Sequence, residues 1–96
     1  MTEGKRLLTR IAQGHFVLSV HALERHQTRA ISEADIRRCA RTATSIRWQE
    51  AHESWRLEGK DTEGARLVVA AVLEEEAVII TVFRPEDGAL SPRRKR

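Results

Sequence analysis

The chain has 96 residues, of which 41% are hydrophobic and 32% are charged, as is typical of one globular domain. No apolar run approaches the ~20 residues that span a bilayer, and the first residues lack the apolar core of a signal peptide. Membrane and secreted proteins are therefore not expected, and a cytoplasmic location is predicted.

The positive charge is concentrated at the C-terminal end. Residues 93–96 carry four positive charges, whereas the rest of the chain has 13 Lys and Arg residues against 14 Asp and Glu residues. We therefore expect one domain over residues 1–88 and a basic, disordered tail over residues 89–96. Such tails contact nucleic acid or an acidic partner in some proteins and only raise solubility in others, and both interpretations stay open.

The first two predicted elements are a helix over residues 3–13 and a strand within residues 15–20. Apolar residues recur at helical spacing in the first segment, and Gly14 suits the position just after a helix end. The second segment, HFVLSV, is rich in β-branched and aromatic residues, as strands are. The apolar stripe of the helix consists of Leu7, Leu8, Ile11 and Ala12.

A second helix is expected to follow this strand and to begin near His21. His21, Arg25 and Arg29 are spaced four apart, so on a helix they share one face. That face is either a solvated surface or a site that handles an anion. The residues predicted to turn inward from the same helix are Ala22, Leu23 and Ala30.

The third helix has the clearest start signal in the chain. Ser32 followed by Asp35 is a close variant of the capping box, and Ile31 and Ile36 stand where a hydrophobic staple belongs. Cys39 continues the apolar stripe that Ile36 opens, so we predict a core residue rather than a nucleophile. A single cysteine cannot form an internal disulfide, which fits a reducing compartment.

From residue 45 onward the sequence alternates between apolar and polar residues, which predicts strands. The segments SIRWQ and SWRLEGK form a hairpin if residues 50–53 are its loop. Trp48 then lies opposite Trp55 on one face, and Arg47 lies opposite Arg56 on the other. Like charges placed opposite each other are unfavourable, so an anion near the two arginines would stabilise the pair.

Two strongly apolar strands complete the prediction, over residues 65–73 and 77–83, with an acidic turn between them. The element order is then helix, strand, helix, helix and four strands, the last four as an antiparallel meander. We predict an α+β fold in which helices pack on one face of a four- to five-stranded antiparallel sheet.

Three blocks of the sequence together resemble a family of small, largely uncharacterised bacterial domains. The blocks are His-Ala-x-x-Arg after a strand, Arg-x-Ile-Ser-x-x-Asp-Ile, and Ile-Thr-Val at the end of a meander, and the likeness covers about residues 6–84. That family resembles the RelE-like toxin superfamily, which shares the barnase, EndoU and colicin fold. The matching residues are His21, Ala22, Arg25, Arg29, Ile31, Ser32, Asp35, Ile36, Ile80, Thr81 and Val82.

The resemblance implies an endoribonuclease toxin that cleaves RNA, either free RNA or RNA on the ribosome. It also implies an antitoxin protein that binds the toxin. Metal-independent RNA cleavage needs a proton acceptor for the ribose 2′-hydroxyl and cations for the charge that develops on phosphate. His21 is the candidate base and acid, because a helix N-terminus disfavours imidazolium. Arg25 and Arg29 are candidate phosphate ligands, and Thr81 is a candidate for orienting an oxygen. The substrate-binding candidates are Arg47, Arg56 and Arg84.

Other interpretations of the same residues stay open. If these residues have a structural role, His21 caps its helix, and Arg25 and Arg29 pair with neighbouring carboxylates. The chain has no tyrosine, unlike many RelE-type ribonucleases. One alternative is therefore a non-catalytic module that binds an antitoxin, a peptide or nucleic acid, and another is an inactive family member. No metal-binding or phosphate-loop motif occurs, so no cofactor is predicted. His15, His26 and His52 are predicted to be surface or loop residues.

Overall fold

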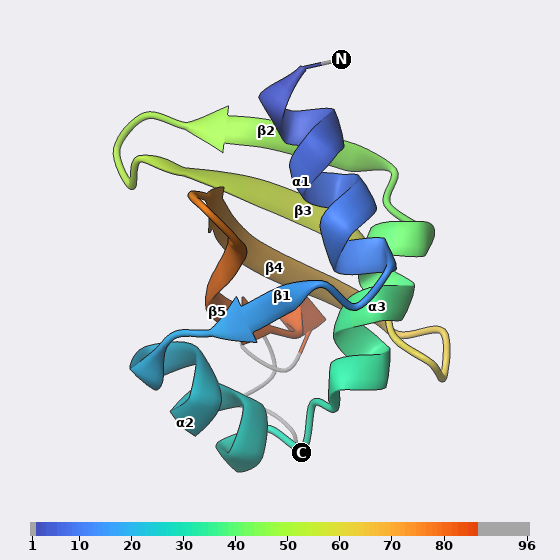
Figure 1. Cartoon of the computed structure of the whole chain (residues 1–96). Helices are drawn as coiled ribbons and strands as arrows, with labels where there is room; N and C mark the ends of the chain where they lie inside the picture. The colour runs from blue at the N-terminus through green and yellow to red at the C-terminus, as the bar shows by residue number, and fades with distance from the viewer. Residues whose placement is uncertain (1, 87–96) are drawn as a thin grey trace.

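The computed structural model describes residues 2–86, and its elements follow the predicted order (Figure 1). Three helices and five strands occur in this part of the chain. The α+β fold predicted from the sequence is therefore confirmed. The elements are α1 (Glu3–Ala12), β1 (Phe16–Leu18), α2 (Val20–Thr28), α3 (Glu33–Arg41), β2 (Ser45–Gln49), β3 (Ser54–Lys60), β4 (Arg66–Leu73) and β5 (Ala77–Phe83).

The five strands form one sheet in the order β1-β5-β4-β3-β2. The four C-terminal strands pair antiparallel, as the predicted meander requires. The first strand, β1, pairs with β5 in parallel, so the sheet is mixed rather than wholly antiparallel. This pairing joins residues 16–18 to residues 77–79, and it brings the start of α2 beside the last strand.

The hairpin of β2 and β3 has the predicted register. Trp48 lies opposite Trp55, and Arg47 lies opposite Arg56, so residues 50–53 form the loop between them. The two indole rings meet edge to face, with centroids 5.5 Å apart. Because side chains alternate along a strand, this register puts the tryptophans and the arginines on opposite faces of the sheet.

The core lies between one face of the sheet and the helices α1 and α3, which stand in front of the strands in Figure 1. The capping box predicted for α3 is present: the Ser32 hydroxyl accepts from the Asp35 N–H, and the Asp35 carboxylate accepts from the Ser32 N–H. The buried core residues are Leu7, Ile11, Ala22, Ile31, Ile36, Cys39, Ala40, Leu57, Leu67, Val69, Ala71, Ala77, Ile79 and Val82.

Cys39 is a core residue, as predicted. Its side chain is buried, and its thiol donates to the Leu67 carbonyl oxygen at 3.3 Å. Burial raises the pKa of the Cys39 thiol to about 12, so the reactive thiolate is scarce at neutral pH. The Cys39 carbonyl lies so close to Gly59 on β3 that a Cβ there would overlap it, which explains a glycine inside a strand.

The predictions for the inward side of α2 are only partly correct. Ala22 is fully buried, but Leu23 is 45% exposed and Ala30 is exposed in a turn. The helix ends at Thr28, and Ala30 adopts a φ of 54°, which reverses the chain toward α3. Figure 1 shows α2 at the edge of the sheet beside β1, so little of its surface reaches the core.

Residues just before and just after α2 form hydrogen bonds with backbone carbonyls of β5 beyond the part that pairs with β1. The Ser19 hydroxyl donates to the Ile80 carbonyl oxygen at 3.1 Å, and Arg29 Nη1 donates to the Val82 carbonyl oxygen at 2.9 Å. Unpaired backbone groups at a sheet edge invite pairing with another chain. These two side chains occupy carbonyls that would otherwise be available at that edge.

The tail predicted over residues 89–96 lies outside the described residues. Within residues 2–86, every helix is too short and too polar to cross a bilayer.

Candidate functional site

Several of the predicted site residues lie on the sheet face opposite α1 and α3, which we call the open face. Arg47 and Gln49 of β2, Arg56 of β3 and Thr81 of β5 belong to it by strand alternation and register. A hollow of about 450 Å³ opens on this face. It is lined by Gln49, His52, Ser54, Arg56, Val68, Ala70, Ile80, Thr81 and Phe83.

A β-bulge shapes the hollow. Ala70 pairs with Thr81 while the next residue, Ala71, pairs with Ile79, so Ile80 is an extra residue in β5. In a regular strand Ile80 and Thr81 would face opposite sides, yet both line the hollow. The bulge is braced from the edge, because Ser19 donates its hydroxyl to the Ile80 carbonyl and its own N–H to the Ile79 carbonyl.

Arg56 lies between an anion and an aromatic ring. Its Nε is 2.9 Å from Oε2 of Glu58, and its Cζ lies 5.7 Å from the centroid of the Phe83 ring. The hydrogen bond from Arg56 lowers the pKa of Glu58, with a further contribution from Arg66. Glu58 is therefore an internal counter-anion for Arg56, while Arg47 across the strand pair is exposed.

His21 and Arg25 belong to α2, which packs against β5, but His21 is not among the residues that line the hollow. His21 is exposed in the first turn of the helix, which Ser19 caps by accepting from the Ala22 N–H at 3.1 Å. Arg25 follows one turn later, but its side chain is not among the described groups. Ser19 connects the start of this helix to the hollow. It is two residues before His21, and its hydroxyl donates to the Ile80 carbonyl at the bulge.

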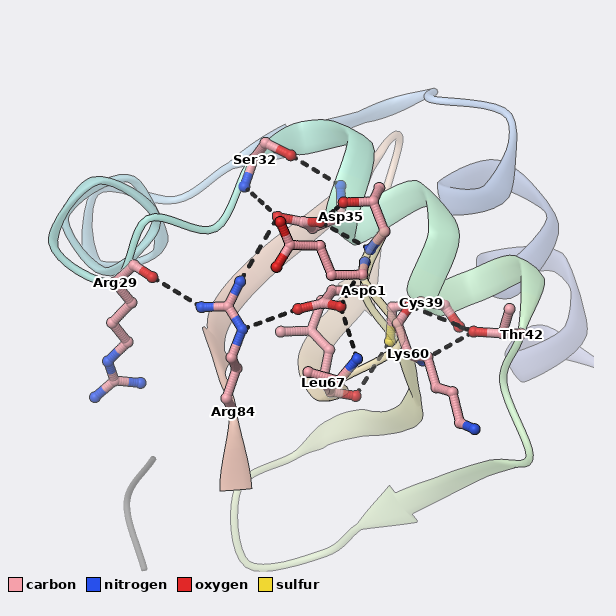
Figure 2. A network of polar contacts seen from close by, with 12 residues as sticks. Arg29, Ser32, Asp35, Cys39, Thr42, Lys60, Asp61, Leu67 and Arg84 are labelled. Atoms are coloured by element: carbon pink, nitrogen blue, oxygen red, sulfur yellow. Dashed lines mark hydrogen bonds and ion pairs between the residues drawn. The ribbon is translucent and has the colours of Figure 1, made fainter. Parts of the chain in front are cut away.

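Arg29 does not continue the helical face of His21 and Arg25, because α2 ends one residue before it. Figure 2 shows its backbone carbonyl facing Arg84, while its guanidinium points away from that residue. The guanidinium donates to the Val82 carbonyl oxygen instead. The structure thus assigns Arg29 a position at the sheet edge rather than a place in a row of three cationic or ionisable groups.

Arg84 lies in a polar cluster with two buried carboxylates (Figure 2). Its Nε donates to Asp61 Oδ2 at 3.0 Å, its Nη1 donates to the Arg29 carbonyl at 2.9 Å, and its Nη2 is 3.8 Å from Asp35 Oδ2. All three guanidinium nitrogens therefore face groups of the domain itself. This arrangement ties the end of β5 to α3 and to the turn after β3.

The two carboxylates also fix the loop between β3 and β4. Asp35 Oδ1 accepts from the backbone N–H and the hydroxyl of Thr62, at 2.9 and 2.7 Å. Asp61 Oδ1 accepts from the backbone N–H groups of Glu63 and Ala65. Burial raises the pKa of Asp35, but hydrogen bonds from Thr62 and Ser32 outweigh it and lower the pKa to about 2. For Asp61, burial is likewise outweighed, by bonds from Ala65, Arg84 and Glu63, so its pKa is lowered.

The lowered pKa of Asp35 predicts a loss of stability in acid. The folded state binds this proton only near pH 2, whereas the unfolded chain binds it near pH 3.8, so the contribution is complete above pH 3.8. It should disappear as the pH falls from 3.8 to 2, at a cost of about 2 kcal/mol. Urea unfolding at a series of pH values measures it. Asp35→Asn should be less stable at neutral pH but show a shallower slope in this window, and an unchanged slope would contradict the assignment.

The structure brings together some predicted site residues and separates others. Arg56 and Thr81 share the hollow, whereas Arg84 and Arg29 serve the polar cluster and the sheet edge. His52 was predicted only as a loop residue; it is in the hairpin loop and exposed, and it also lines the hollow. The predicted hairpin register was the available signal, because it puts the loop beside Gln49 and Arg56.

No group of three or more His, Cys, Asp or Glu side chains within residues 2–86 is arranged to hold a metal ion.

The family model described as "Domain of unknown function (DUF4258)" matches residues 18–84, which is more than half of the chain. No curated protein and no solved structure matches. The matched segment starts at the end of β1 and includes α2, the polar cluster and every residue that lines the hollow. The chain therefore belongs to the DUF4258 family.

Proposed function

We propose that this domain binds RNA on its open face and cleaves it without a metal ion, as a RelE-like toxin of a toxin–antitoxin pair. The observation that carries the proposal is the hollow, where Arg56, Thr81 and His52 come together from three parts of the chain. An arginine supplies forked donors for phosphate, a threonine supplies a hydroxyl, and a histidine supplies an imidazole that forms hydrogen bonds. Cleavage by a ribose 2′-hydroxyl needs such groups around the phosphate and also a proton-transfer group, for which we propose His21.

In the proposed reaction the 2′-hydroxyl loses its proton, attacks the adjacent phosphate and expels the 5′-oxygen, which takes up a proton. His21 is the proposed base and acid, and Arg25 the proposed phosphate ligand on the same helix. Arg56 and Arg47 hold phosphate on the open face, and Thr81 orients an oxygen. Arg29 and Arg84 take positioning roles, because the hydrogen bonds of their side chains hold β5 in place.

The internal pairing of Arg56 is compatible with phosphate binding. Its side chain is 37% exposed, and the salt bridge to Glu58 uses its Nε. A surface ion pair of this kind is worth no more than about 1 kcal/mol, so a phosphate that offers two oxygens competes with it. The partners that the proposal implies are RNA, free or on the ribosome, and an antitoxin protein.

The test is incubation of the purified chain with end-labelled RNA in the presence of EDTA. Products with 2′,3′-cyclic phosphate and 5′-hydroxyl ends are expected, and Arg56→Ala should reduce the rate by about tenfold or more, since it removes a charge-stabilising donor. Arg6→Ala, which alters an exposed arginine on α1, is the matched control and should cleave normally. Intact RNA with both the free and the ribosome-bound substrate would contradict the proposal.

A second candidate function is a binding module without catalysis. Three apolar side chains are exposed near the start of α2: Val17 at 42%, Val20 at 78% and Leu23 at 45%. Exposed apolar groups that lie close in the chain mark protein contacts in many domains. A tight complex with the protein encoded beside this chain, together with RNA that stays intact, would favour this function over cleavage.

A further inference from the structure

We propose that the hollow on the open face is the seat of one nucleobase, with the adjoining phosphate directed toward Arg56. The inference rests on the proposed RNA binding and specifies where a single nucleotide is held. The observation behind it is that one cavity of about 450 Å³ combines an apolar floor with a rim of hydrogen-bonding side chains. Cavities of this size and composition are typical of sites for small organic ligands.

The floor of the hollow is apolar because two neighbouring strands contribute hydrophobic side chains to it. Ala70 leaves room at the centre, since its register partners are the larger Arg56 on β3 and Thr81 on β5. The bulge adds Ile80, which a regular β5 would have turned away. An apolar floor favours a flat, poorly hydrated ring over a hydrated ion. The floor residues are Val68, Ala70, Ile80 and Phe83.

The rim supplies polar groups that suit a base edge and a phosphate. Amide, imidazole and hydroxyl groups both donate and accept hydrogen bonds, as base edges do. Arg56 is held over the Phe83 ring, so its guanidinium is in addition a planar surface on which a base can stack. The rim residues apart from Arg56 are Gln49, His52, Ser54 and Thr81.

The two parts of the hollow together select the class of ligand. The guanidinium at the rim, with exposed Arg47 across the strand pair, favours a ligand with negative charge over a neutral apolar peptide. The apolar floor favours a ring over inorganic phosphate. A nucleotide carries both a flat ring and a phosphate, and a base of RNA can be splayed out of its strand to reach such a seat.

The experiment is an NMR titration of the full chain with each of the four nucleoside 3′-monophosphates and, separately, with inorganic phosphate. At least one nucleotide is expected to shift the backbone signals of the hollow and the imidazole signals of His52. Ala70→Leu fills the floor and should weaken that binding by about tenfold or more, as loss of a stacked base does. Val72→Leu is the matched control, because Val72 is two residues on along the same face of β4 and does not line the hollow.

Each outcome separates this inference from the proposed function. If Ala70→Leu does not fold, as its melting curve would reveal, His52→Ala changes an exposed loop residue and should weaken binding instead. Equal binding of phosphate and nucleotides, or equal nucleotide binding by the wild type and the folded variants, would overturn the nucleobase seat. Nucleotide binding without RNA cleavage would defeat only the proposed catalysis. RNA cleavage at an unchanged rate by Ala70→Leu would defeat only the seat.

Discussion

Replacing Arg84 with alanine is expected to lower the free energy of unfolding by about 3–5 kcal/mol, a large part of the stability of a domain of this size. The reason is that Arg84 neutralises two buried carboxylates at once. Asp35 is 6% exposed and Asp61 is 3% exposed, and both are charged at neutral pH in the wild-type protein because their pKa values are lowered. Removing the guanidinium leaves two like charges near each other with no cation. Urea denaturation followed by circular dichroism measures the effect.

Two further variants show whether the loss comes from this geometry. Arg66→Ala removes an arginine whose ion pairs with Glu58 and Glu86 are at the surface, so it should cost no more than about 1 kcal/mol. Arg84→Lys keeps the charge but has one donor atom instead of three, and it should recover only part of the stability. If Arg84→Ala is as stable as the wild type but no longer binds RNA, Arg84 is a phosphate ligand after all.

Local patterns in the sequence were sufficient for most of the fold. The capping box of Ser32 and Asp35 depends on residues three apart, and the hairpin register depends on matching two tryptophans across a four-residue loop. Both are decided by neighbours in the chain, so both were predicted correctly. The burial of Cys39 follows from helical spacing for the same reason.

The features that the sequence did not predict depend on contacts between distant segments. The parallel pairing of β1 with β5 joins residues about sixty positions apart, and the bulge at Ile80 adds one residue to a strand whose sequence is strongly apolar. The end of α2 at Thr28 is decided by the turn into α3, where Ala30 has a positive φ. Charge and spacing alone therefore could not separate Arg29 and Arg84, which hold the fold, from Arg56, which lines the hollow.

The same contacts give a physical meaning to one of the blocks that suggested the family. In Arg-x-Ile-Ser-x-x-Asp-Ile, the two isoleucines are core residues, and Ser32 and Asp35 cap α3. Arg29 bonds β5 through its side chain and Arg84 through its carbonyl. The residues of this block thus connect α2, α3 and β5. Chemistry at the proposed site falls to residues outside it, of which His21 is the one that a single substitution tests best.

His21→Ala is expected to reduce RNA cleavage by about 10²- to 10⁴-fold and to abolish growth inhibition when the protein is expressed, because it removes the proposed proton-transfer group. The melting temperature should change little, since His21 is exposed in the first turn of α2 and Ser19 supplies the cap. The rate is measured with labelled RNA in EDTA, and the stability by thermal unfolding.

The control for His21 is His15→Ala, another exposed histidine, in the turn between α1 and β1. It should leave both cleavage and stability unchanged. If His21→Ala cleaves normally while His52→Ala loses activity, proton transfer belongs to the hollow, and the start of α2 only braces the bulge through the preceding residue, Ser19. If His21→Ala unfolds the protein, the histidine is a structural residue of the helix start, and the catalytic role assigned to α2 is wrong.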